Sequence, residues 1–373
     1  MKKIVYAFLL LIVSVFAANA QQTSENVLKL LAKKNVISTK EADSLIAVEK
    51  KAAPAKSFYL LDKVKVFGYG HIGYSYSDTL PQRQSYGVKR IISFIEGKLT
   101  DNITFQIQSN LGPTPALVEY WMEYAPKTFV KLKVGQMKLP FSIENAISQS
   151  VLENVTNSQA INNLVGGSTD VLGAGNMSGR DCGIQLAGSF LAYQKRNLVD
   201  YQLGIFNGNG VNNMDNNRHK DFVGTLMFNP FSYLKVGGSL YAGKANYKNV
   251  IELGDAKAVD HLRNRWSLGG EVTTKYVYGR AEYVHGTDAH INREGYYALL
   301  NGHVCPKIDV IAEYDFYNKN VDVNGKKFTN YQIGMQWNFY KRSRFQLHYV
   351  YKDNNAVGVR SENAVLGQLQ VGF

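Results

Sequence analysis

Residues 330–339 read Asn-Tyr-Gln-Ile-Gly-Met-Gln-Trp-Asn-Phe, so that apolar positions alternate with amides or glycine without a break. The same alternation returns in residues 344–351 and 367–373. Successive side chains of a β-strand point to opposite faces, so each stretch has one apolar and one polar face. A soluble β-sandwich shows this period too, with its apolar face inside. Here the polar face is neutral and rich in amides, while aromatic residues stand at both ends of the apolar face. This combination is typical of a transmembrane β-barrel with lipid outside and water inside.

Sixteen strands of this kind, separated by turn-forming residues, can be counted from residue 65 onward. Single-chain outer-membrane barrels have an even number of strands, and sixteen enclose an aqueous channel where eight would be filled by side chains. Fourteen or eighteen strands stay open as alternatives. The expected strands are residues 65–76, 87–99, 101–109, 116–125, 128–136, 180–191, 199–206, 221–229, 233–243, 264–276, 279–286, 294–304, 308–317, 329–340, 343–352 and 363–373.

The first 56 residues differ from this pattern. Two lysines, an apolar run over residues 4–17 and the small-x-small site Ala18-Asn19-Ala20 predict a secretory signal peptide over residues 1–20. A retained membrane anchor is the alternative, although the run is shorter than the roughly 20 residues of a spanning helix. Residues 21–56 predict two short helices and a linker. This segment is either a periplasmic interaction arm or a simple leader to a barrel over residues 57–373.

Charge and cysteine content narrow the function. The chain has a formal net charge of +12, and cleavage of the signal peptide would leave +10. A basic balance suits nucleic acid, an anionic membrane surface or an anion pathway, and export argues against nucleic acid. Cys182 and Cys305 are far apart and match no metal-binding spacing, so we expect two incidental thiols.

One predicted connection is much longer than the others. It spans about residues 137–179, and its later part is rich in Asn, Ser and Gly. Long segments without strands are usually functional or disordered. In a water-filled barrel such a segment can fold into the lumen, where its backbone is hydrated and where it narrows the pore. We therefore predict a constriction loop, with a plain extracellular loop as the alternative.

Two sequence blocks resemble the phosphate-selective porin O/P family. Residues 134–144, Val-Gly-Gln-Met-Lys-Leu-Pro-Phe-Ser-Ile-Glu, look like its GQxKxPF…E signature, and residues 206–221 look like its FNGxG…D…KD block. The resemblance extends over about residues 64–373. It implies a sixteen-stranded, trimeric porin in the outer membrane of a Gram-negative cell, in contact with lipid and lipopolysaccharide. Members favour small anions, and the best-known ones move phosphate or polyphosphate.

Basic residues fall on the polar faces of several predicted strands. For example, Val130, Leu132 and Val134 form one apolar face, which directs Lys131 and Lys133 into the channel. Fixed positive charges in a low-dielectric wall concentrate anions and repel cations, and the arginine fork suits phosphate or carboxylate oxygens. The predicted pore-lining, anion-binding residues are Arg90, Lys98, Lys131, Lys133, Lys138, Arg265, Lys275, Arg280 and Arg344.

Acidic residues fall on the same faces, so the lumen is expected to be mixed. No run of arginines steps across several strands, and residues 87–99 are nearly apolar on both faces. The mixed lumen and the lack of an arginine run favour a weak-to-moderate anion preference over a dedicated phosphate site. The inward acids are Glu119, Glu123, Glu271, Glu282, Asp309, Glu313 and Asp315.

An enzyme is the less favoured class. The chain has no Gly-x-Ser-x-Gly and no His-Glu-x-x-His motif, and its seven histidines are scattered singly. We therefore predict no catalytic group, no metal and no cofactor. Two further alternatives are a non-conducting structural or adhesion barrel, which predicts no conductance, and an exported soluble sandwich, which predicts release without detergent.

Overall fold

The computed structural model describes residues 63–373 except positions 115, 168, 171–178, 195, 248–258 and 356–357, together with the isolated positions 29, 33, 38–40 and 43. The predicted signal peptide and nearly all of the predicted leader over residues 21–56 lie outside the described residues. None of the helices in the part of the chain that is described has the length and apolar character needed to cross a membrane.

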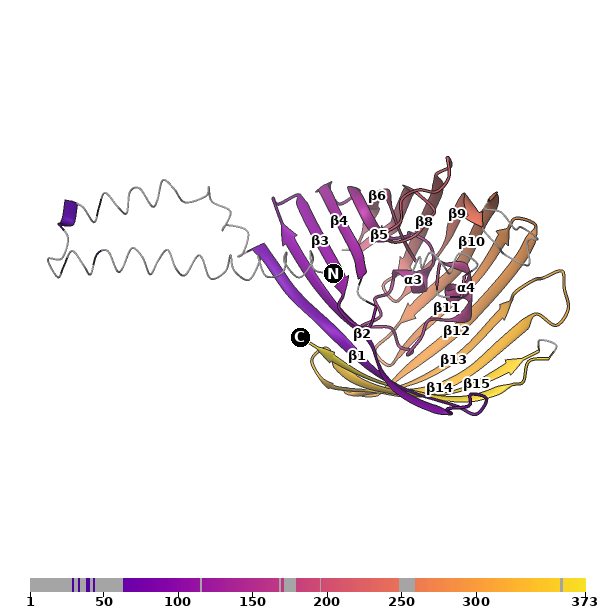
Figure 1. Cartoon of the computed structure of the whole chain (residues 1–373). Coiled ribbons are helices and arrows are strands. Elements are labelled where there is room, and N and C mark those ends of the chain that lie inside the picture. The colour runs from indigo at the N-terminus through magenta and orange to yellow at the C-terminus, as the bar shows by residue number, and fades with distance from the viewer. Residues whose placement is uncertain are drawn as a thin grey trace. The chain divides into compact units, whose positions relative to one another are not determined.

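The described residues form sixteen antiparallel strands in one closed barrel, in which every strand pairs with its sequence neighbours and β1 pairs with β16 (Figure 1). This confirms the predicted fold class and strand number. The largest shift is in β10, which begins five residues before its predicted start because residues 259–263 continue the ladder with β9. The strands are β1 (Val64–Ser77), β2 (Gln84–Lys98), β3 (Ile103–Asn110), β4 (Ala116–Lys127), β5 (Val130–Lys138), β6 (Arg180–Tyr193), β7 (Arg196–Phe206), β8 (Asp221–Phe231), β9 (Leu234–Tyr247), β10 (Val259–Thr273), β11 (Val277–Asp288), β12 (Ile291–Cys305), β13 (Ile308–Asn318), β14 (Lys327–Tyr340), β15 (Ser343–Asn354) and β16 (Glu362–Gly372).

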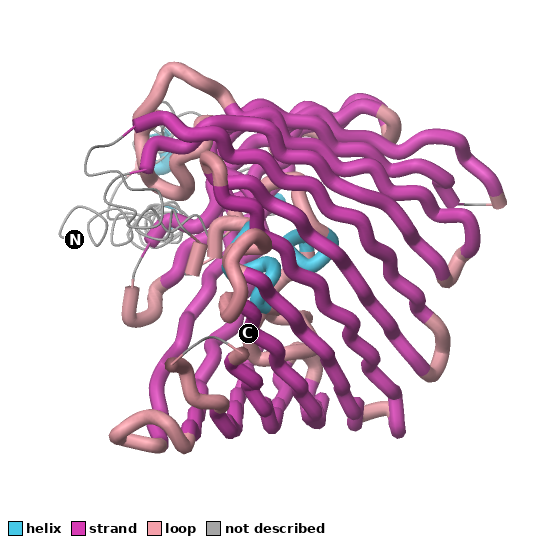
Figure 2. Tube along the Cα trace, turned by 90° about the vertical axis from the view of Figure 1, so that its right-hand side faces the viewer, coloured by secondary structure: helices cyan, strands magenta, loops and turns pink. Residues whose placement is uncertain are grey.

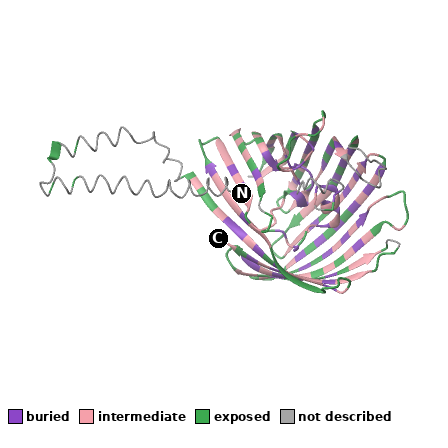
Figure 3. Cartoon of the chain, viewed as in Figure 1, coloured by how far each residue is buried: buried purple, intermediate pink, exposed green. Residues whose placement is uncertain are grey.

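Burial alternates along many of the strands (Figure 3), as expected when successive side chains point to opposite faces of the wall. On β14, Ile333 is 58% exposed and Trp337 47% exposed, whereas the intervening Gln336 is 7% exposed. In an isolated barrel the exposed face is the outer one, and exposed apolar residues there are expected to meet lipid. The amides between them face the lumen.

A row of tyrosines crosses the outer face of five neighbouring strands. Tyr283, Tyr296, Tyr314, Tyr331 and Tyr351 lie on β11 to β15, with successive ring centroids 5.4 to 6.4 Å apart. Aromatic side chains concentrate where the apolar band of a barrel meets lipid headgroups, because one end of the ring is apolar and the other is wet. The row is a candidate for such a belt, although several of its tyrosines, such as Tyr283 and Tyr314, lie within their strands and not at the strand ends.

The described residues of the segment between β5 and β6, which are 139–167, 169–170 and 179, lie inside the barrel (Figure 2). We call this segment the inner loop. It contains the short helices α3 (Ile143–Ala146) and α4 (Gln159–Leu164), and α4 packs against β11, β12 and β13. Gly295 on β12 permits this packing, since a Cβ atom there would lie 2.8 Å from the Cβ of Ala160.

Candidate functional site

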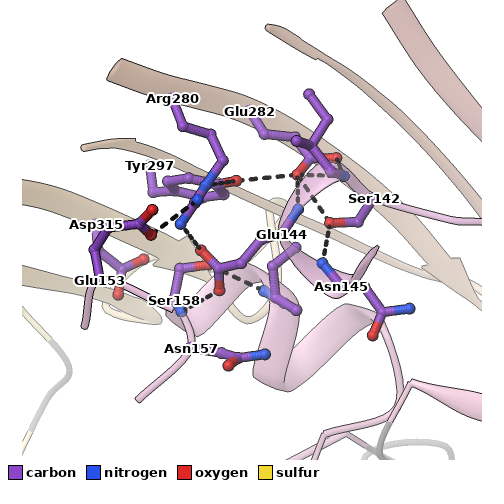
Figure 4. A network of polar contacts seen from close by, with 12 residues as sticks. Ser142, Glu144, Asn145, Glu153, Asn157, Ser158, Arg280, Glu282, Tyr297 and Asp315 are labelled. Carbon is purple, nitrogen blue, oxygen red and sulfur yellow. Dashed lines mark hydrogen bonds and ion pairs between the residues drawn. The ribbon is translucent and has the colours of Figure 1, made fainter. Parts of the chain in front are cut away.

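A buried polar network around Arg280 attaches the inner loop to the wall (Figure 4). The Arg280 guanidinium lies 3.0 Å from a carboxylate oxygen of Glu153 and 3.4 Å from one of Glu144, and its Nε donates to the Tyr297 hydroxyl at 3.1 Å. Arg280 is 2% exposed. The predicted pore-lining residue Arg280 is therefore on the inner wall but is occupied in holding the loop.

Carboxylates receive the backbone N–H groups at the starts of both loop helices. Glu282 on β11 accepts the Ile143 N–H at 3.1 Å and the Ser142 hydroxyl at 2.8 Å. Asp315 on β13 accepts the Gln159 N–H at 2.9 Å. Unpaired N–H groups at a helix start favour negative charge, so these acids fix the helices in place.

Glu144 joins the two helices to Arg280. Its carboxylate accepts the Ser158 N–H at 2.8 Å and lies in a fully enclosed position. Burial raises the pKa of Glu144 to about 7, an effect that the positive charge of Arg280 opposes.

A second set of arginines holds the later part of the inner loop. Arg263 on β10 makes a two-point contact with Asp170, each N–O distance being 2.9 Å. Arg265 and Arg293 both contact Asp288, at 2.6 and 3.1 Å, and Arg265 also donates to the Leu164 carbonyl oxygen at 3.2 Å. All three arginines are 2% exposed or less.

These contacts correct one expectation. The sequence indicated no run of arginines across strands, yet Arg263, Arg265, Arg280 and Arg293 lie on the inner faces of the neighbouring strands β10, β11 and β12. Arg263 and Arg293 are absent from the predicted set. The i, i+2 spacing of Arg263 and Arg265 could have shown that both lie on one face. Every one of the four is paired with a carboxylate.

Three predicted lysines lie around a cavity of about 560 Å³ between the inner loop and the wall. Lys131 and Lys133 line it, and the Lys133 ammonium lies 3.3 Å from the carboxylate of Glu123. Lys138 also lines it, but its ammonium donates to the carbonyl oxygens of Asn145 and Ile147 at 2.7 and 2.6 Å. Lys138 therefore holds the base of the inner loop.

The placement of Lys275 on an inward strand face is wrong. Strand β10 ends at Thr273, because Thr274 closes a tight turn: its N–H donates to the Val277 carbonyl at 2.9 Å. Lys275 lies within that turn, with its ammonium 5.2 Å from the centre of the Tyr276 ring. It is not part of the inner wall.

The remaining predicted residues lie on a different part of the wall. Lys98 is opposite Thr104 at the end of β2, and Arg90 is opposite His71. Arg344 on β15 donates to the Gln336 side chain at 2.7 Å, to the Gln370 side chain at 3.2 Å and to the Gln149 carbonyl at 3.3 Å. All three partners of Arg344 are neutral.

Comparison with known proteins shows likeness only to solved structures, since no family model and no curated protein sequence matches the chain. The anion-selective porin from Comamonas acidovorans is 13% identical, with a TM-score of 0.59 over 83% of this chain and 99% of that one. The OmpT outer membrane protein of Vibrio cholerae, in its trimer form, is 11% identical, with a TM-score of 0.61 over 83% and 99%. The outer membrane channel DcaP of Acinetobacter baumannii is 11% identical, with a TM-score of 0.55 over 83% and 97%. This chain has the fold of the outer-membrane porins. At these identities the likeness is one of fold.

Proposed function

We propose that this protein is an outer-membrane porin, a water-filled channel through which small hydrophilic solutes diffuse passively. One observation carries the proposal: the sixteen strands close into a barrel with amides and charged groups on the inner face and apolar side chains on the outer face. The cavities of about 560 and 530 Å³ beside the inner loop support a hydrated lumen. The predicted signal peptide would direct the chain to export.

The inner loop would narrow this channel. Beyond its base at Lys138, its hydrogen bonds run from Gln370 on β16 to Thr225 on β8, so the loop lies along this half of the wall. Its helices occupy space that would otherwise be water. Solutes would pass between the loop and the opposite wall, which carries Arg90, Lys131 and Lys133.

These positions support a preference for anions. Arg90 and Arg344 are paired with no carboxylate among the described residues, whereas Lys133 is partly balanced by Glu123. An unbalanced cation in a narrow, low-dielectric passage raises the local concentration of anions. Phosphate-like anions are included in this class.

The family motif supports a relationship to the phosphate-selective porin O/P family through the loop. Within residues 134–144, Lys138 holds the loop base, Ser142 caps α3 and Glu144 contacts Arg280. The motif residues therefore build the inner loop, and phosphate selectivity is a separate question. By analogy with the trimer form of OmpT, we propose a homotrimer in contact with lipid and lipopolysaccharide.

Conductance of the purified protein in a planar lipid bilayer tests this proposal. A porin gives open, ohmic steps, and a reversal potential under a KCl gradient should report anion preference, with phosphate added as a competing anion. A reversal potential of the cation-selective sign would overturn the anion preference and leave the pore intact.

A non-conducting structural barrel is the second candidate, because the inner loop is bonded to many strands of the wall. It predicts a complete absence of steps from protein that is folded and inserted. A difference in migration between heated and unheated samples in a detergent gel would establish that the barrel is folded.

A further inference from the structure

Aromatic rings line the lumen where β1 meets β2. Phe67 and Phe94 are opposite each other in the ladder, with ring centroids 4.9 Å apart and planes at 10°, and Tyr69 lies 6.2 Å from Phe94. We call these three residues the aromatic strip. They face inward, because the intervening Gly68 lies against the ring of Phe373 on the outside. Porin lumens are normally polar, so an inward apolar strip calls for an explanation.

Two arginine side chains lie near the aromatic strip. The Arg342 guanidinium, from the turn between β14 and β15, lies 5.1 Å from the centre of the Phe67 ring. Arg344 is 5% exposed and donates only to neutral oxygens. A buried guanidinium without a carboxylate partner is costly, and a bound anion would balance its charge.

The strip and the arginines line one cavity of about 530 Å³, a volume within the range of small-molecule sites. Three cations, Lys341, Arg342 and Arg344, line it, against the single carboxylate of Glu96. Neutral hydrogen-bonding groups complete it: Gln336, Asn338 and Gln370 from the wall, and Ser148 and Ser150 from the inner loop.

We propose that this cavity binds organic anions that carry a carboxylate and a flat aromatic face. The carboxylate would lie at Arg344, whose fork suits its two oxygens, and the ring would stack on the aromatic strip. An inorganic anion would use only the arginines, so the strip distinguishes the two kinds of solute. The inference rests on the proposed porin function and names a solute class for the same lumen.

Current block of the full-length protein in a planar bilayer tests the proposal, with benzoate, acetate and benzylammonium as probes in KCl. Benzoate should interrupt the current at a concentration about 5-fold or more below that of acetate, the gain expected from one aromatic stacking contact. Benzylammonium, which has the same ring and the opposite charge, should give no block at these concentrations.

Single substitutions test whether the aromatic strip and Arg344 cause the block by benzoate. Phe94→Leu keeps an apolar side chain and removes the ring, so it should reduce the difference between benzoate and acetate to less than about 2-fold while KCl steps persist. Arg344→Gln should weaken block by both carboxylates. The matched control is Phe345→Leu, which removes a ring opposite Trp337 on the outer face and should leave benzoate block unchanged.

The outcomes separate the two proposals. An absence of KCl steps in folded wild-type protein would refute the porin function. Normal KCl steps with equal block by benzoate and acetate would refute the aromatic-anion site alone, as would an unchanged benzoate block in Phe94→Leu.

Discussion

The arginines on two parts of the inner wall differ in their partners. On β10 to β12, Arg263, Arg265, Arg280 and Arg293 are each paired with a carboxylate and hold the inner loop. On the wall formed by β15, β16, β1 and β2, Arg344 has only neutral partners. We call these the paired wall and the open wall. Because a paired arginine adds almost no net charge, counting inward arginines overestimates the field in the channel.

The largest effect is expected from Arg280→Ala on the paired wall. It would leave the carboxylates of Glu144 and Glu153 buried without their cation, at a cost of about 3–5 kcal/mol in the free energy of unfolding. The inner loop should detach, so that single-channel conductance rises and protease cleaves the loop. Arg280→Lys, which keeps the charge, should show a smaller change. Wild-type conductance and protease resistance in Arg280→Ala would show that the pairing does not hold the loop.

A rise in pH should also destabilise the paired wall, but by less than Arg280→Ala does. The pKa of Glu144 is raised from 4.5 to about 7, so the folded protein retains a proton that the unfolded chain releases. The free energy of unfolding should therefore fall as pH rises from about 4.5 to about 7 and then level off. Thermal unfolding in detergent at pH 5 and pH 8 measures this. Glu144→Gln should reduce the difference even though Arg280, Glu153 and Glu282 still surround the site, and an undiminished pH dependence would assign it to other groups.

On the open wall, Arg344→Gln should lower the anion-to-cation permeability ratio by about 2- to 5-fold, because its guanidinium hydrogen-bonds only to neutral groups and makes no direct ion pair among the described residues. Reversal potentials under a KCl gradient measure the ratio. Lys275→Gln removes a charge of the same sign from a turn outside the lumen and serves as the control. Equal shifts in the two variants would mean that net charge, and not the position of Arg344, sets the ratio.

The smallest change is expected from Lys133→Gln. Its ammonium is paired with Glu123 and the two side chains are 21% and 20% exposed, so the pair resembles a solvated surface ion pair. We expect a change of less than about 1 kcal/mol in stability and a smaller shift in reversal potential than for Arg344→Gln. A shift as large as that of Arg344→Gln would remove the distinction between paired and open cations.

The sequence predicts local features of this molecule well and distant ones poorly. The alternation of Ile333 and Gln336 determines the faces of a strand, and the same argument puts Lys131 and Lys133 on one face, where both line a cavity. The pairing of Arg263 with Asp170 joins residues 93 positions apart, and no local pattern predicts it. Lys275 was misplaced because the turn formed by Thr274 ends the strand early.

The aromatic strip could have been noticed in the amino-acid sequence. The middle of strand β2, residues 91–95, reads Ile-Ile-Ser-Phe-Ile and is nearly apolar on both faces, which is unusual for a strand with water on one side. Ile92 and Phe94 are the apolar residues on the inner face of that strand, opposite Tyr69 and Phe67. An apolar inner strand face can therefore indicate a solute-binding site. The arginines that complete this site, Arg342 and Arg344, lie far away in the sequence, so the strand alone does not predict them.

Gly295 is a position at which a substitution could change the channel diameter. Because its missing side chain gives room to Ala160, valine at 295 would act as a wedge beneath α4 and tilt that helix inward, toward the remaining passage. We expect Gly295→Val to alter the sieving diameter while leaving all formal charges unchanged. Size exclusion and ion preference could then be adjusted independently within a single scaffold.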